Sequence, residues 1–161
     1  MARTDVAIFP KTRETRSVNP NTVIISDGRG VTADLASAYE ATGRTQLSVM
    51  EVKGLDISKY GVVVPNRTPG SVAGLIEKPE ADKAPSNLAS IGRYVLTPDI
   101  FEILRNQQAG AGGEIQLADA INTQAANNAV ETVKLKGRRF DCGSVEGYLD
   151  AIMHVAERRK R

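Results

Sequence analysis

The sequence predicts an α/β domain in which strands and helices alternate and pack in layers. Short runs of β-branched and apolar residues alternate with segments where apolar residues recur at helical spacing, and glycine and proline separate them. A chain of 161 residues is the size of one domain and buries roughly two-thirds of its unfolded surface. We therefore expect a single domain of α/β or mixed layered class.

The first readable elements are a strand and a helix. Val23–Ser26 is β-branched and runs into the turn Asp27-Gly28, which is typical of a strand end. Thr32 can cap the helix that follows, and Gly43 can end it as a left-handed glycine. Between them, apolar and small residues repeat at helical spacing at Leu35, Ala38, Tyr39 and Thr42.

The middle of the chain is rich in strands. Turn residues Pro65–Gly70 join two of them, and a polar loop over 81–86 precedes the last. The alternating segments predict strands over 46–52, 60–64, 71–77 and 89–96.

The C-terminal third returns to helices. Thr97 and Pro98 predict a capped helix through Leu104, and the glycines of 110–113 precede another helix over 115–127. A strand over 130–135 follows. The final helix starts at Ser144 and carries its apolar residues on one face, at Val145, Tyr148, Leu149, Ile152 and Val155.

Charge and cysteine content exclude several classes of protein. The 21 basic and 19 acidic residues are interspersed and leave a net charge of +2, which gives no support to nucleic-acid binding. The basic run Arg158–Arg161 suits the carbonyl end of a helix. One cysteine, Cys142, cannot form an internal disulfide, and no apolar stretch is long enough for a membrane span. We expect a cytoplasmic protein.

The pair Glu77-Lys78 ends a predicted strand just before Pro79. A carboxylate accepts hydrogen bonds from sugar hydroxyls, and an ammonium group is a compact charge that suits a phosphate. Two adjacent residues can therefore hold both ends of a sugar phosphate. An exposed charged pair at a strand end is the alternative reading.

Asp27 and Asp141 each follow a predicted strand and precede a glycine or cysteine-glycine turn. Ligands and metals are commonly met at strand ends in α/β sheets, and magnesium prefers oxygen ligands. The two carboxylates could share one Mg²⁺. Alternatively, each is a turn aspartate bonded to its own backbone.

Nine segments taken together resemble the bacterial UTP-glucose-1-phosphate uridylyltransferase family, over roughly residues 23–156. They are ATGR (41–44), KYGVV (59–63), IEKP (76–79), APSNLA (84–89), GRYVLTP (92–98), GAGGEIQL (110–117), DAI (119–121), FDCG (140–143) and GYL (147–149).

The resemblance implies a Rossmann-like nucleotide-diphospho-sugar transferase fold with a mixed central sheet, here incomplete. It implies that Glu77 binds glucose hydroxyls, that Lys78 holds the phosphate of glucose 1-phosphate, and that Gly61 lets the backbone approach the sugar. It also implies Mg²⁺ as cofactor, with Asp141 and Asp27 as its ligands.

The reaction implied is attack of glucose 1-phosphate on the α-phosphorus of UTP, which gives UDP-glucose and pyrophosphate. Lys78 and Asp141 would be the catalytic residues. No covalent intermediate is required, so catalysis would depend on alignment and on neutralising phosphate charge. The family also implies a homo-oligomer.

The resemblance fails in the N-terminal segment 1–22. The family's Gly-rich nucleotide-binding loop has no counterpart there, because Lys11–Glu14 stand where the glycines would be, and only Val6–Phe9 resembles a strand. Residues 23–161 are thus expected to form the sugar-phosphate-binding portion, with the nucleotide-binding residues unknown. Two hypotheses stay open: a shortened uridylyltransferase, or a non-catalytic module that binds sugar phosphates or associates with another chain.

Overall fold

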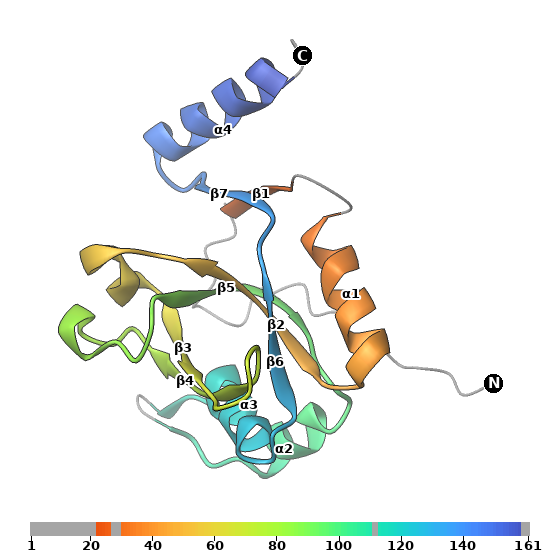
Figure 1. The fold of residues 1–161 in the computed structure, drawn as a ribbon. Coiled ribbons are helices and arrows are strands. Elements are labelled where there is room, and N and C mark those ends of the chain that lie inside the picture. The colour runs from red at the N-terminus through yellow and green to blue at the C-terminus, as the bar shows by residue number, and fades with distance from the viewer. Residues whose placement is uncertain (1–21, 27–29, 111–112, 159–161) are drawn as a thin grey trace.

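The computed structural model describes residues 22–26, 30–110 and 113–158 (Figure 1). The expected strand Val6–Phe9 and the candidate ligand Asp27 lie outside these residues. In chain order the elements are β1 (Thr22–Ser26), α1 (Val31–Thr42), β2 (Thr45–Glu51), the 3-10 helix η1 (Gly54–Lys59), β3 (Gly61–Pro65), β4 (Val72–Glu77), the 3-10 helix η2 (Ala81–Lys83), β5 (Leu88–Val95), α2 (Ile100–Asn106), α3 (Leu117–Ala126), β6 (Val130–Lys134), β7 (Gly137–Asp141) and α4 (Val145–Arg158).

Two sheets organise these elements. The larger has five strands in the order β4-β3-β5-β2-β6, in which only the β2–β6 pair is parallel and the other pairs are antiparallel. The smaller is the antiparallel pair β1–β7. The prediction of an α/β domain with a mixed sheet is confirmed.

Helices cover both faces of the larger sheet. Leu47 and Val49 of β2 belong to a buried apolar cluster that includes Ile121 of α3 and Ile100 of α2. Side chains alternate along a strand, so Gln46 faces the other way and bonds to Thr42 at the end of α1. The sheet is therefore buried from both sides at β2, which explains the nearly continuous burial of that strand.

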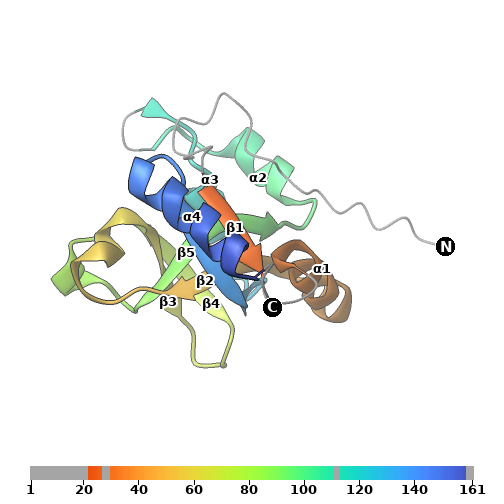
Figure 2. The same ribbon diagram turned by 90° about the horizontal axis from the view of Figure 1, so that it is seen from above.

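The smaller sheet and α4 lie apart from this core. Figure 1 shows β1, β7 and α4 grouped beyond one end of the larger sheet, and Figure 2, the view from above, shows α4 at the centre in front of β1. Phe140 of β7 is buried, and its ring lies 5.4 Å from that of His154 in α4. We refer to β1, β7 and α4 as the outer unit.

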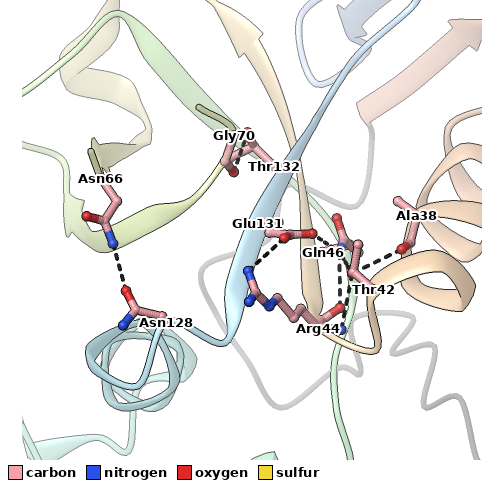
Figure 3. Close-up of polar contacts among 9 residues, drawn as sticks. All are labelled: Ala38, Thr42, Arg44, Gln46, Asn66, Gly70, Asn128, Glu131 and Thr132. Carbon is pink, nitrogen blue, oxygen red and sulfur yellow. Dashed lines mark hydrogen bonds and ion pairs between the residues drawn. The ribbon is translucent and has the colours of Figure 1, made fainter. Parts of the chain in front are cut away.

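A network of polar side chains connects the strands of the larger sheet at the end where the turn 66–71 lies (Figure 3). Glu131 of β6 accepts hydrogen bonds from Arg44 Nη1 at 3.0 Å and from Gln46 Nε2 at 2.9 Å. The backbone N–H of Thr132 donates to the carbonyl of Gly70 at 2.8 Å, and Asn66 donates to Asn128 at 2.9 Å. These contacts anchor the closed end of the β3–β4 hairpin, and so orient its open end.

Both threonines that were expected to cap helices have other positions. α1 starts at Val31 with Gly30 as its N-terminal cap residue and without a side-chain capping bond, so Thr32 is inside the helix. α2 starts at Ile100 after Asp99. The Thr97 hydroxyl instead accepts a hydrogen bond at 2.7 Å from the buried amide of Gln124. The same amide also donates to Asp99 Oδ1 at 3.0 Å, so Thr97 belongs to a buried polar network and does not cap the helix. The expected left-handed end of α1 at Gly43 is confirmed by its φ of 67°.

Candidate functional site

The open end of the β3–β4 hairpin brings Gly61 and Glu77 together. The two residues are opposite one another in the antiparallel ladder. A Cβ atom on Gly61 would lie 3.0 Å from Glu77 Oε2, so the carboxylate occupies the space above the glycine. The Glu77 side chain is 46% exposed and can reach a ligand.

Lys78 follows in a conformation that is uncommon for a residue with a side chain. Its φ is 45°, in the left-handed region, which costs a non-glycine residue about 1–3 kcal/mol. Its backbone N–H donates to the carbonyl of Tyr60 at 3.0 Å, which stabilises the turn. The Lys78 side chain is 61% exposed, and its ammonium nitrogen lies 4.0 Å from Glu77 Oε1. Strain of this kind is concentrated at ligand sites.

Two hydroxyl groups of β5 complete this end of the sheet, and sequence reasoning missed them. Ser90 pairs with Gly61 across the ladder, and its Oγ lies 3.3 Å from the Tyr94 hydroxyl. Burial raises the pKa of the Tyr94 phenol; the bond to Ser90 opposes this shift and the charge of Glu77 adds to it. Tyr94 therefore stays neutral, and its hydroxyl oxygen accepts the hydrogen bond from Ser90. In the sequence, the only indication of a role for Ser90 and Tyr94 was their spacing as two polar residues in an otherwise apolar strand.

Asp141 ends β7 in a turn. Its Oδ1 accepts a hydrogen bond from the backbone N–H of Gly143 at 3.1 Å, as expected of a turn aspartate, and the side chain is 49% exposed. The hydrogen bond and charge of Asp56 raise the pKa of Lys59, and the charge of Asp141 adds to the shift.

Tyr60 connects Asp141 to the hairpin. Its hydroxyl accepts a hydrogen bond from Arg139 Nη1 at 3.0 Å, and its carbonyl accepts the bond from Lys78. Arg139 Nη2 lies 4.0 Å from Asp141 Oδ2. The structure thus groups Gly61, Glu77 and Lys78 directly, and links Asp141 to them through two further side chains.

The candidate ligand Asp27 is not described, so its pairing with Asp141 stays a prediction. Ser26, the residue before it, pairs with Gly137, whereas Asp141 pairs with Thr22 at the other end of the β1–β7 ladder. Within ranges 22–26, 30–110 and 113–158, no three His, Cys, Asp or Glu side chains gather as a metal site. A single carboxylate such as Asp141 is sufficient for the kind of coordination in which Mg²⁺ takes one protein carboxylate and completes its coordination shell with substrate phosphate and water.

A shallow hollow of about 540 Å³ lies between η1 and η2. Its lining includes Val52, Leu55, Ile57 and Ala81 but none of Gly61, Glu77, Lys78 or Asp141. The candidate site is therefore the exposed hairpin end and not this apolar hollow. Within the described residues, no helix combines the length and apolar character that a bilayer crossing requires.

The apolar face of α4 is exposed. The side of α4 that packs against β7 carries the buried Ala151 and also His154, whose ring lies beside that of Phe140, whereas larger apolar side chains face outward. Those at least 48% exposed are Val145, Tyr148, Leu149, Ile152 and Met153. They lie at helical spacing and form one stripe, which we call the α4 stripe. Exposed apolar stripes of this kind are commonly interaction surfaces.

Known proteins with similar sequences and folds point to one family. The chain matches the family described as Nucleotidyl transferase over residues 11–158. A UTP--glucose-1-phosphate uridylyltransferase of Pseudomonas aeruginosa is 44% identical over 128 residues, which are 78% of this chain and 46% of that protein. The crystal structure of an apo UDP-glucose pyrophosphorylase matches with a TM-score of 0.77 at 40% identity, over 87% of this chain and 53% of that one.

A UDP-glucose pyrophosphorylase complexed with UDP-glucose matches with a TM-score of 0.74 at 41% identity, over 88% of this chain and 55% of that one. The chain spans about half the length of the relatives that it matches. The predicted resemblance is confirmed by these relatives, and the match covers both the outer unit and the sheet. The chain belongs to the nucleotidyl transferase family.

Proposed function

We propose that residues 23–161 form the sugar-phosphate-binding portion of a UTP-glucose-1-phosphate uridylyltransferase. In the proposed reaction a phosphate oxygen of glucose 1-phosphate attacks the α-phosphorus of UTP, and pyrophosphate leaves as UDP-glucose forms. The observation that carries this proposal is the hairpin end, where Glu77 lies over Gly61 and Lys78 turns back in a left-handed conformation. Relatives named as uridylyltransferases support the choice of substrate.

Each residue of the hairpin end has a proposed role. The Glu77 carboxylate accepts hydrogen bonds from glucose hydroxyls, and the absence of a side chain at Gly61 leaves room for the sugar beside it. The Lys78 ammonium neutralises the phosphate. Tyr94 and Ser90, which lie at the same end of the sheet, can supply hydroxyl groups to the sugar.

Catalysis in this proposal depends on alignment and electrostatics. Holding the phosphate against Lys78 fixes the attacking oxygen and offsets charge that accumulates during transfer. We propose Asp141 as a carboxylate ligand of Mg²⁺, with Asp27 as the candidate second ligand. Bound magnesium would supply a Lewis acid for the phosphate oxygens.

Binding of glucose 1-phosphate to the 161-residue chain tests the first step. Isothermal titration calorimetry should show binding that Lys78→Ala weakens by at least about tenfold, or 1.4 kcal/mol. Lys83→Ala is the matched control, because Lys83 is a similarly exposed lysine five positions along the chain whose charge pairs with Glu80 at 2.6 Å. Equal affinity of the wild type and Lys78→Ala would contradict the proposed grip. Formation of UDP-glucose from UTP, glucose 1-phosphate and Mg²⁺ tests the complete reaction.

The magnesium ligand needs its own measurement. Mn²⁺ in place of Mg²⁺ should broaden the NMR signals of residues around Asp141, Gly143 first, when glucose 1-phosphate is present. Asp141→Asn should remove that broadening, whereas Asp82→Asn on η2 should leave it. Broadening that persists in Asp141→Asn would exclude Asp141 as a ligand.

A second candidate function, association with another copy of this chain, is favoured by the α4 stripe. We propose an antiparallel pairing of two α4 helices. Twofold symmetry places the same face of each helix in the interface, so the two stripes bury each other.

Light scattering across protein concentrations tests this association. The wild type should form dimers, and the pair Leu149→Glu with Ile152→Glu should stay monomeric, because each change places a charge in the stripe. Glu40→Lys, an exposed change on α1, should leave the dimer intact. A wild type that is monomeric at every concentration would contradict the association.

A cytoplasmic location is also proposed, supported by the single free cysteine, Cys142.

A further inference from the structure

The outer unit is joined to the larger sheet by a short bend. β6 ends at Lys134 and β7 begins at Gly137, so only Leu135 and Lys136 separate the two strands. Leu135 is still bonded to the larger sheet through its N–H, which donates to the Val49 carbonyl at 2.8 Å. The chain then turns at Gly137, whose φ is 136°, a value that side-chain-bearing residues rarely adopt. This bend can act as a hinge for the outer unit.

One contact spans the hinge close to the candidate site. The Tyr60 ring packs against the cluster of Ile57, Val62 and Ala89, so it belongs to the larger sheet. The Arg139 side chain, only 13% exposed, comes from β7. It donates to the Tyr60 hydroxyl at 3.0 Å, and its guanidinium carbon lies 5.2 Å from the centre of the ring. The contact therefore combines a hydrogen bond with a cation–π interaction.

The same two residues touch both parts of the candidate site. Tyr60 accepts the backbone bond of Lys78, and Arg139 is two positions before Asp141. The contact therefore restrains movement of Asp141 relative to Lys78 about the bend at Gly137. With this contact in place, the phosphate-binding lysine and the carboxylate keep a fixed separation.

We propose that the Arg139–Tyr60 contact fixes the position of the outer unit, and with it Asp141, relative to the hairpin end that carries Lys78. We call this contact the joint. This role rests on the proposed function insofar as it concerns sugar phosphate binding. Arg139 is a positioning residue here, since it acts through Asp141 and Tyr60 and not on the substrate.

Residual dipolar couplings of the 161-residue chain test the joint without any ligand. In the wild type, amides of the larger sheet and of the outer unit should fit one alignment tensor. In Arg139→Gln they should need two tensors, with each part still folded. Arg138→Gln is the matched control: Arg138 is the neighbouring arginine on β7, it lies over Phe140 and not over Tyr60, and its loss should leave one tensor.

Tyr60→Phe provides a second variant that keeps the packed ring and removes only the hydroxyl. It should also weaken the joint and give a second tensor, or a lower order parameter for the outer unit. If both Arg139→Gln and Tyr60→Phe retain the single tensor of the wild type, the joint is overturned. The outcome does not depend on whether the chain binds a sugar phosphate.

Titration with glucose 1-phosphate tests the link to the site. In the wild type the amide signals of Lys78 and Gly143 should shift together, and in Arg139→Gln only the Lys78 signal should shift, with about tenfold weaker affinity. A full Gly143 shift in Arg139→Gln would overturn the positioning role. If neither signal shifts in the wild type, the proposed function fails, and the dipolar couplings still decide whether the joint exists.

Discussion

The carboxylate of Glu77 lies directly over Gly61, so that a single methyl group on the glycine would come within 3.0 Å of Glu77 Oε2. This contact joins neighbouring strands of the hairpin at its open end. It makes the position of the carboxylate depend on the residue at 61.

Gly61→Ala should therefore displace the Glu77 carboxylate and weaken binding of glucose 1-phosphate about tenfold, or 1.4 kcal/mol. The fold should be little affected, because the displaced group is the flexible, half-exposed end of a side chain. Calorimetric titration provides the measurement. In a Glu77→Ala background, Gly61→Ala should cause a smaller further loss of affinity, which measures how far the methyl group obstructs the sugar directly; an equal loss in both backgrounds would show that displacement of Glu77 contributes nothing.

Lys78→Gly should separate stability from binding. Glycine tolerates the φ of 45°, so this variant should gain up to about 1 kcal/mol in free energy of unfolding over Lys78→Ala, which keeps the strain. Both variants lose the ammonium group and should lose affinity for glucose 1-phosphate equally. Urea denaturation and calorimetry measure the two properties. Equal stability of the two variants would mean that the left-handed conformation is not costly here.

Asn122 of α3 holds β4, which is at the edge of the sheet. Its Oδ1 accepts from the N–H of Leu75 at 2.6 Å, and its Nδ2 donates to the Leu75 carbonyl at 3.1 Å, so the side chain replaces a neighbouring strand. Asn122→Leu should destabilise the chain by about 1–3 kcal/mol, because two partly buried backbone groups lose their partner.

The matched control for Asn122→Leu is Asn106→Leu. The Asn106 amide makes one exposed bond to its own helix, so its replacement should change stability by less than about 0.5 kcal/mol. Urea unfolding of both variants gives the comparison. Similar effects of the two substitutions would refute the role of Asn122 as a clamp on the strand edge.

Glu131 should make stability depend on pH in the acid range. Burial pushes its pKa up, but hydrogen bonds from Gln46, Thr42 and Arg44 outweigh burial and hold the pKa below its ordinary value of 4.5. A carboxyl group with a lowered folded-state pKa contributes stability above the unfolded value, and that contribution is lost as the pH falls through the folded-state pKa.

Glu131→Gln should thus cost about 1–2 kcal/mol at pH 7, and the difference from the wild type should shrink as the pH drops below 4.5. Denaturant unfolding at pH 7 and at pH 3 measures this. Glu40→Gln, on the exposed side of α1, controls for the loss of a carboxylate and should change the free energy of unfolding at pH 7 by less than about 0.5 kcal/mol. A cost of Glu131→Gln that is the same at both pH values would contradict the assignment.

Local patterns predicted most elements of the fold. β-branched alternation located β2 to β6 within one or two residues, and Gly43 ended α1 as expected, because strand pleating and left-handed glycines are decided by neighbouring residues. The helix starts were less well predicted. The hydroxyl of Thr97 has a partner 27 positions away at Gln124, which no local pattern reveals.

The sequence by itself determined the family and the group Gly61, Glu77 and Lys78, since the short hairpin β3–β4 forces these residues together. Only the tertiary structure decided how Asp141 relates to them. The separation of Asp141 from Lys78 depends on the bend at Gly137 and on the contact between Arg139 and Tyr60, which are 79 positions apart in the sequence. Contacts between residues so far apart in the sequence follow from how whole elements pack. The exposure of the α4 stripe has the same origin, because the periodicity of the sequence defines an apolar face, but packing decides whether anything covers it.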